Sequence, residues 1–428
     1  MAPSPKAGKA GPANVVIIGG GISGLAAALE LARSGISTTV LEAKKRFGGR
    51  IHTLRHNGIS IELGAEFVHG RSKPLLDAIQ SAELSTQAVP ETNRTFENGK
   101  LQDTKIWEII SEVLRRVDIH KPDCSIDDFL AGQLLDEHTR ALVRNFVTGF
   151  DAAHTDRISA HARRRAEYSG EQISMDQQSR VTEGYSALVE YFVREIEARG
   201  GRLIMGAKVG RIRWEEGKVD VLVGRSRRAR VYSGGAAVVT LPVGVLKAGD
   251  LIFEPSLPDK IEAAHGLEFG NVAKVIFHFR DTTWDDFGFI HVPNAPIPTW
   301  WSDSRGPIIT GWAGGAYADS LLKFSTKQLC TTGLEILSRI LFNGAAVPVL
   351  RRQLLAVHYH NWAEDPDILG AYSYIPVNGM DLPKLLAAPV AGTLFFAGEA
   401  TVTDAQTGTV FGALETGQRA AREILAMD

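Results

Sequence analysis

The chain has 428 residues, of which 44% are hydrophobic and 22% charged, and its formal net charge is −2. This composition is typical of a soluble globular protein with room for two domains, and it excludes a basic protein that binds nucleic acid through charge alone. Two cysteines are too few for a disulfide framework and favour a reducing, cytoplasmic location. No run of 18 apolar residues occurs, so we expect no membrane anchor, and we expect residues 1–13 to form a flexible tail.

The first motif along the chain is also its most specific one. Residues 15–18 are all apolar and predict a buried strand, after which Gly19, Gly21 and Gly24 form the pattern G-x-G-x-x-G. A helix is expected next, and then a second apolar strand over 38–41. This order of strand, glycine turn, helix and strand predicts a dinucleotide-binding βαβ unit.

Each position of this unit has a physical reason. Gly19 permits a tight turn, Gly21 lets the backbone approach a pyrophosphate, and Gly24 lets helix and strand pack closely. The N–H groups of the helix N-terminus then face the phosphates. Glu42 ends the second strand, where a carboxylate accepts hydrogen bonds from ribose hydroxyls and disfavours a 2′-phosphate. The expected ligand is therefore FAD or NAD rather than NADP.

A second glycine turn follows. Arg50 comes directly after Gly48 and Gly49, so it can reach a pyrophosphate held by the first turn, and Lys44 can assist. Alternating apolar residues then predict a strand over 59–63.

The next residues suggest a close backbone approach. Gly64 and Ala65 let the main chain come near a flat or bulky group. His69 follows, and taken alone it is more typical of a core histidine than of a functional one.

Helical periodicity dominates residues 73–200 and predicts a helical lobe. Helices are expected at 74–82, 105–117, 126–130, 136–149, 160–168 and 185–198. Ser125 with Asp128 predicts an N-terminal cap. The basic runs at 163–165 and 225–230 are expected to be solvated surface.

Strand patterns return after residue 200. A hairpin is expected around 215–217, a buried strand over 236–242, a loop over 251–258 and a strand over 269–279. Lys274 lies within the last strand among apolar residues. It is either an edge-strand lysine that faces solvent or a buried residue with a function, because lysines are rarely buried otherwise.

Aromatic residues mark the C-terminal third. Four of the seven tryptophans lie between 284 and 312, where they form either core or the wall of a pocket for an apolar or cationic ligand. A helix is expected over 326–341 and a strand over 354–359. The last segment predicts a strand, a turn at Gly398 and Glu399, and a helix that begins near Thr409.

Taken in this order, the motifs resemble those of the flavin amine oxidases, the family of monoamine oxidases, polyamine oxidases and lysine-specific histone demethylases. The resemblance extends from residue 15 to about 425 and includes the C-terminal signature FAGE…GALETG. It implies an α/β fold in which a Rossmann-type FAD-binding domain is interleaved with an α+β substrate-binding domain. The implied FAD-binding domain comprises 14–72, 201–265 and 380–428, and the substrate-binding domain with its helical lobe comprises 73–200 and 266–379.

The resemblance implies FAD as cofactor and assigns it contacts. Glu42 is expected at the adenosine ribose, Val209 at the adenine through its backbone, and Val410 at the pyrimidine end of the flavin. The residues expected to hold FAD are Gly19, Gly21, Ser23, Gly24, Glu42, Lys44, Gly49, Arg50, Gly64, Ala65, Glu66, Val209, Gly398, Glu399, Thr409 and Val410.

It also implies the catalytic residues. Lys274 matches the family lysine that contacts flavin N5 through a water, and Trp362 and Tyr372 match aromatic positions in front of the flavin. His69 with its following glycine resembles a pair near the substrate tunnel of polyamine oxidases, which makes it a candidate active-site residue. No metal site is expected.

Three departures from the family pattern bear on how FAD is attached, on the substrate and on the role of Glu66. No cysteine follows Cys330, so the FAD is expected to be noncovalent. Thr409 stands where monoamine and many polyamine oxidases carry an aromatic residue and resembles the demethylase pattern, but no coiled-coil insertion supports a histone substrate. Glu66 is unusual beside a flavin and either neutralises an amine or pairs with an arginine.

The expected activity is oxidation of an amine C–N bond to an imine, which water hydrolyses, with O2 reduced to H2O2. A polyamine or another extended amine is the preferred substrate, and the chain is expected to be a monomer or homodimer. The alternatives are an L-amino-acid oxidase of the same fold, which needs an arginine to bind the carboxylate, and a catalytically silent flavoprotein scaffold.

Overall fold

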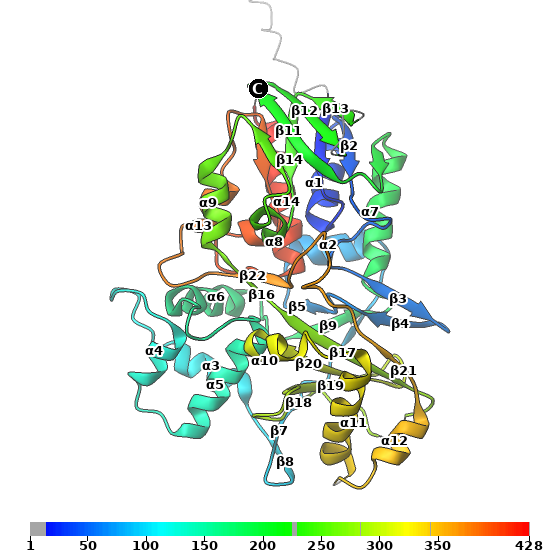
Figure 1. Cartoon of the computed structure of the whole chain (residues 1–428), viewed down its shortest axis with the longest axis vertical. Coiled ribbons are helices and arrows are strands. Elements are labelled where there is room, and N and C mark those ends of the chain that lie inside the picture. Colours follow the sequence, from blue (N-terminus) through cyan, green and yellow to red (C-terminus); the bar gives the residue numbers. More distant parts are fainter. Residues whose placement is uncertain (1–13, 225–228, 283, 343, 428) are drawn as a thin grey trace, which may run out of the picture.

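The computed structural model describes residues 14–427 except 225–228, 283 and 343 (Figure 1). The expected tail over 1–13 and most of the basic run over 225–230 lie outside the described residues.

A five-stranded parallel sheet forms the half of the molecule drawn at the top of Figure 1. Its strands, in order across the sheet, are β10 (Arg202–Ile204), β2 (Ser37–Leu41), β1 (Asn14–Ile18), β14 (Ala236–Val239) and β23 (Leu394–Phe396). Residues 15–18 of β1 and all of β14 are apolar, because both faces of a parallel sheet are covered. This confirms the predicted βαβ unit and the α/β architecture.

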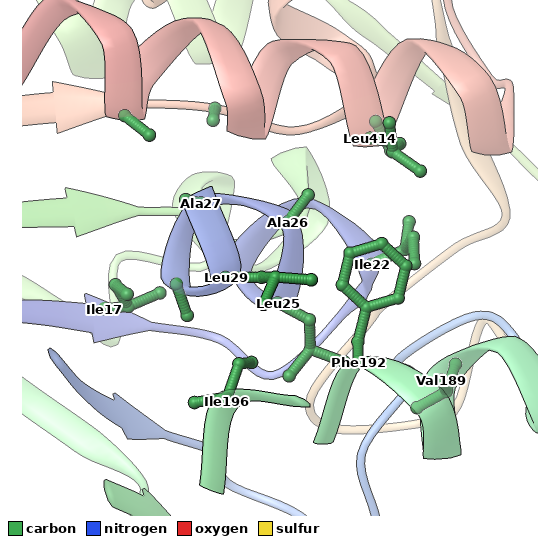
Figure 2. Packing of buried hydrophobic residues seen from close by; sticks show 14 of the residues in the cluster. Ile17, Ile22, Leu25, Ala26, Ala27, Leu29, Val189, Phe192, Ile196 and Leu414 are labelled. Carbon is green, nitrogen blue, oxygen red and sulfur yellow. The ribbon is translucent and has the colours of Figure 1, made fainter. Parts of the chain in front are cut away.

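Three helices cover one face of this sheet. They are α1 (Ile22–Arg33), α7 (Ser186–Ala198) and α14 (Val410–Leu425). Figure 2 shows α1 between the other two, with Leu29 and Leu25 near Phe192 and Ile196 of α7, and Leu414 of α14 on the opposite side. The N-terminal motif therefore packs against the last helix of the chain.

A four-stranded sheet covers the other face. Its strands are β13 (Arg230–Gly234), β12 (Lys218–Val223), β11 (Val209–Glu215) and β15 (Ile252–Glu254). The predicted hairpin between β11 and β12 is confirmed. The loop expected over 251–258 is partly wrong, because β15 pairs in parallel with β11, a partner about 40 residues away that local sequence does not reveal.

A seven-stranded sheet forms the lower half of Figure 1. Its strands, in order, are β21 (Leu354–His358), β17 (Val272–Phe279), β20 (Ile308–Gly314), β19 (Thr299–Asp303), β18 (Phe289–His291), β7 (Asn93–Glu97) and β8 (Lys100–Asp103). One face packs on α10 (Gly315–Leu321) and α11 (Thr326–Phe342). Strand β17 lies inside the sheet and is buried over its whole length, so Lys274 is not an edge-strand lysine.

The six helices predicted between 73 and 200 are all present. Besides α7 they are α2 (Lys73–Ser81), α3 (Ile106–Leu114), α4 (Ile126–Ala131), α5 (Glu137–Phe150) and α6 (Ala160–Gln172). The predicted cap is confirmed, since Ser125 Oγ accepts a hydrogen bond of 3.0 Å from the Asp128 N–H.

This region also holds strands that the sequence pattern did not predict. In addition to β7 and β8, a small sheet joins β5 (Phe67–His69), β9 (Gln178–Val181) and β6 (Thr86–Ala88). These strands are short and largely polar, and they form because distant segments pair with one another rather than because of an apolar alternation.

The other elements connect these layers. They are β3 (Thr53–His56), β4 (Ile59–Glu62), β16 (Glu268–Gly270), β22 (Tyr372–Tyr374), α8 (Val243–Lys247), α9 (Pro258–Gly266), α12 (Val347–Gln353), α13 (Leu382–Ala387) and a 3-10 turn, η1 (Glu399–Thr401). Among the described residues, no single helix has both the length and the apolar composition needed to cross a membrane; α11 and α12 meet that test only as a pair bent by 113°.

The contact between α1 and α14 gives a first prediction. A methyl group at Gly417 would lie 2.0 Å from the backbone oxygen of Ser23. Alanine gains about 1 kcal/mol over glycine in a helix interior, but separating two packed helices costs typically about 1–3 kcal/mol and occasionally more. We expect Gly417→Ala to lower the thermal unfolding midpoint.

The control is Gly132→Ala at the end of α4. There φ is −80° and the nearest atom to an added methyl group lies 3.5 Å away, so we expect an equal or higher midpoint. Equal midpoints for wild type and Gly417→Ala would contradict the close packing of α1 on α14.

Candidate active site

A cavity of about 930 Å3 runs from the carboxyl ends of the parallel strands, past β17, to helices α3, α5 and α6. All of the predicted catalytic and FAD-binding residues line this cavity except Gly24. Gly24 instead serves packing, because a methyl group there would lie 2.0 Å from the Gly19 backbone oxygen.

The first glycine turn forms one end of the cavity. Gly19 has φ +108°, a left-handed conformation that favours glycine, and a methyl group added at Gly21 would meet no atom within 4 Å. The buried hydroxyl of Ser23 has no hydrogen-bond partner within the described part of the chain. This end therefore offers open space, an unused hydroxyl and a helix N-terminus, which suits a phosphate.

Glu42 lies beside this turn with its carboxylate fixed by the backbone. Its two oxygens accept hydrogen bonds from the N–H groups of Gly20 at 2.7 Å and Lys44 at 2.8 Å. Burial raises the pKa of Glu42, and these two donors oppose that shift. The remaining acceptor capacity faces a cavity in which ribose hydroxyls are natural donors.

Lys44 and Arg50 line the cavity, but carboxylates already bind both. The Lys44 ammonium lies 2.6 Å from Asp365 Oδ2. Arg50 Nη1 donates to Glu399 Oε1 and to the Ala371 carbonyl, each at 2.8 Å. These carboxylates therefore partly neutralise the positive charge that Lys44 and Arg50 offer to a pyrophosphate.

The backbone at Gly64 is pressed against the second glycine turn. A methyl group at this position would lie 1.9 Å from the Arg50 oxygen and 3.1 Å from the Trp362 ring. The Ala65 N–H donates to that same oxygen at 3.0 Å. Gly64 thus permits a close backbone contact with the second glycine turn, and Ala65 lies on the cavity wall.

Lys274 lies in the middle of the cavity with its side chain only 3% exposed. Its ammonium donates to the Gly64 carbonyl at 3.0 Å and lies 2.7 Å from Glu66 Oε2. The other oxygen of Glu66 accepts from Arg180 Nε at 2.7 Å and from Trp301 Nε1 at 2.9 Å. Glu66 therefore pairs with an arginine, one of its two expected roles, and also with Lys274.

The charge state of Glu66 follows from these contacts. Burial alone would raise its pKa, but the charges of Lys274 and Arg180 outweigh burial and lower the pKa to about 2. Glu66 is consequently an anion throughout the neutral pH range.

The two aromatic residues expected in front of a flavin both line the cavity. Trp362 donates from Nε1 to the Leu63 carbonyl at 3.1 Å, and the Tyr372 hydroxyl donates to the Phe150 carbonyl at 2.8 Å. Burial raises the pKa of Tyr372, so it remains a neutral phenol. Of the tryptophans between 284 and 312, Trp301 and Trp312 line the cavity, whereas Trp300 belongs to the core.

His69 lies on the cavity wall rather than in the core. Its ring makes edge contacts with Phe67 and Phe150, each with centroids 5.8 Å apart. Burial lowers its pKa to about 4, and its Nδ1 has no hydrogen-bond partner among the described residues. The imidazole is therefore neutral near pH 7.

The remaining predicted positions complete the wall. Val209, Gly398 and Val410 line the cavity, as does Gly49. Thr409 caps α14, because its hydroxyl accepts from the Gly412 N–H at 3.1 Å.

The sequence pattern did not predict a buried charged cluster that lies on α6 and at the end of α5. Arg163 is 5% exposed, so the expected solvated surface over 163–165 is wrong at this residue. Its guanidinium lies 2.9 Å from Asp151 and 3.4 Å from Glu167, and all three residues line the cavity. The i, i+4 spacing of Arg163 and Glu167 was visible in the sequence, but the third partner comes from the end of α5.

Comparisons with known proteins agree with this geometry. The model of the family described as flavin containing amine oxidoreductase matches residues 22–123 and 115–425. Polyamine oxidase 3 of Oryza sativa subsp. japonica is 28% identical, over 96% of this chain and 88% of its own length. Lysine-specific histone demethylase 1 homolog 2 of the same plant is also 28% identical, over 99% of this chain but only 58% of its own length.

Solved structures share the fold. Putrescine oxidase in its putrescine-bound form superposes with a TM-score of 0.82 at 19% identity, covering 96% of this chain and 99% of that chain. Cyclohexylamine oxidase from Brevibacterium oxydans gives a TM-score of 0.81 at 20% identity, covering 96% and 98%. Because the family model spans nearly the whole described chain, this protein belongs to the flavin-containing amine oxidoreductases and uses FAD as its cofactor.

Proposed function

We propose that the chain oxidises a C–N bond of an extended amine with several positive charges, such as a polyamine. The product is an imine, which water hydrolyses to an aldehyde or ketone, and O2 is reduced to hydrogen peroxide. The observation that carries this proposal is the negative charge at the end of the cavity formed by α3, α5 and α6.

That end has more acids than bases. Among the described residues, six carboxylates line it against two arginines. The acids are Glu108, Glu112, Asp151, Glu167, Glu171 and Asp176, and the arginines are Arg115 and Arg163. Glu108 and Glu112 also pair with Lys105 and Arg116, so the six carboxylates face four cations. The remaining excess of negative charge within a partly enclosed cavity attracts the distal ammonium groups of an extended amine.

Within this proposal the glycine-turn end holds FAD. Ser23 and the α1 N-terminus face the pyrophosphate, Glu42 accepts from the ribose, and Gly64 and Ala65 approach the ring. The bound flavin supplies the redox chemistry by accepting a hydride equivalent from the carbon next to nitrogen. Trp362 and Tyr372 orient the amine between aromatic faces.

An amino acid is a weaker candidate because its carboxylate needs a free arginine. In the part of the chain that the structure describes, three arginines line the cavity, and each one already pairs with a carboxylate. These pairs are Arg50 with Glu399, Arg115 with Glu171, and Arg163 with Asp151. A silent scaffold is also weaker, since Lys274 and both aromatic residues remain on the cavity wall.

The polyamine relatives and the putrescine-bound neighbour support the same substrate class. The cytoplasmic location also remains a proposal, supported by two cysteines that are both free thiols.

Substrate class can be tested by bleaching the flavin absorbance with amines under anaerobic conditions. We expect diamines and polyamines to bleach it and amino acids to leave it oxidised. Asp151→Asn removes one charged contact worth about 1.5–3 kcal/mol, so we expect KM for a polyamine to rise about 10- to 100-fold, with KM for a monoamine unchanged.

The control for this experiment is Glu190→Gln, which removes a half-exposed partner of Arg55 outside the cavity and should leave both KM values unchanged. Bleaching by amino acids alone would favour the amino-acid oxidase, and bleaching by no amine would favour the scaffold.

Noncovalent attachment of FAD gives another prediction. Neither Cys124 nor Cys330 lines the cavity, so no thiol is placed to bond the flavin. Acid precipitation should therefore leave all of the flavin absorbance in the supernatant. Flavin retained on the washed, denatured chain would contradict this prediction.

A further inference from the structure

The environment of Lys274 contains a feature that the family relationship does not explain. Lys274 lies in the middle of the cavity, and the carboxylate of Glu66 lies 2.7 Å from its ammonium. Both side chains are almost fully buried, at 3% and 5% exposure. A buried ammonium without a partner is costly, because burial disfavours the charged form, and the carboxylate offsets that cost.

Glu66 cannot turn away from Lys274 at low cost. Its second oxygen is held by the guanidinium of Arg180 and the indole N–H of Trp301, so the carboxylate is fixed from two sides. Rotation toward the cavity would break the charge-assisted hydrogen bond from Arg180 and the neutral one from Trp301 at a buried position.

Arg180 is in turn fixed by its own neighbours. Its Nη2 donates to the Ser302 carbonyl at 3.2 Å, and its guanidinium lies 4.8 Å above the centre of the Phe67 ring. Asp303 Oδ2 lies 3.9 Å from Arg180 and 2.7 Å from Arg305. The charges therefore alternate from Lys274 to Arg305 through a buried row.

Further titratable groups near Lys274 come from three strands, β4, β17 and β21. Glu62 on β4 accepts from the Tyr185 N–H at 2.8 Å, and burial raises its pKa. Farther along the same face of β17 and its neighbour β21 lie His278 and His358, and burial lowers the pKa of both. These histidines are neutral near pH 7, so they add no positive charge beside Lys274.

We propose that Glu66 is a positioning residue that keeps Lys274 protonated and fixes its ammonium against the Gly64 carbonyl at the cavity wall. Lys274 is then a permanent cation beside the flavin rather than a proton acceptor. This inference depends on the bound flavin but not on which amine is the substrate.

The test uses the flavin absorbance of the resting holoenzyme without substrate, because a charge near the flavin ring changes its electronic properties. In the wild type the spectrum should not change between about pH 6 and 9. In Glu66→Gln the unpaired Lys274 should lose its proton within that range, so the spectrum should shift with a single-proton titration.

A second substitution identifies the titrating group. In the double variant Glu66→Gln, Lys274→Met the titration should disappear. A matched control is Glu254→Gln, which removes a carboxylate 3.0 Å from Arg213 outside the cavity and should keep the pH-independent spectrum. A purely structural role for Glu66 would lower the thermal midpoint without creating a titration.

Glu66→Asp is used if Glu66→Gln does not fold. Aspartate keeps the negative charge but, being one methylene shorter, places it farther from Lys274. We therefore expect a spectral titration near the alkaline end of the pH range, and we expect Lys274→Met to abolish it. The proposal is overturned if the folded variant has the pH-independent spectrum of the wild type, or if the titration persists after Lys274 is replaced.

Discussion

The carboxylate of Glu399 lies where three distant segments of the chain meet. It accepts from Arg50 at 2.8 Å, from the Ser373 hydroxyl at 2.6 Å and from the Gly408 N–H at 2.9 Å. A buried carboxylate with three donors is costly to disturb, because removing any one leaves charge unpaired in a low-dielectric site. The glycine turn, β22 and the start of α14 are thereby held in one arrangement, and the cavity exists only where they meet.

The charges along the cavity follow a gradient. Near Lys274 positive and negative side chains alternate and cancel, whereas the end at α3 and α6 carries excess negative charge. Under the proposed function this gradient orients an extended amine. A fixed cation beside the flavin disfavours a protonated nitrogen at the reacting end, while the distal ammonium groups are stabilised at the acidic end.

Elements whose residues are close together in the sequence could be predicted, whereas elements that depend on distant partners could not. The βαβ unit occupies one continuous stretch, so strand, turn and helix were predicted from Gly19 to Glu42. Strands β9 and β15 were missed because each forms only by pairing with a distant partner. The predicted site residues other than Gly24 line one cavity, and each was recognisable because it belongs to a short motif. The partners of Glu66 were not predictable, since Arg180 and Trp301 lie 114 and 235 residues away and no pattern links them.

The two aromatic residues show how such distant contacts produce a defined site. Trp362 and Tyr372 each bind a backbone carbonyl through their polar end, which fixes the ring without using its faces. Glycines then set the ring positions: Gly64 lies against Trp362, and a methyl group at Gly408 would lie 2.7 Å from the Tyr372 ring. Any larger residue at either glycine would displace a ring, because protein interiors cannot absorb an extra methyl group without movement. The orientation of the aromatic faces is therefore determined by the backbone of two other segments, one of which also donates to Glu399.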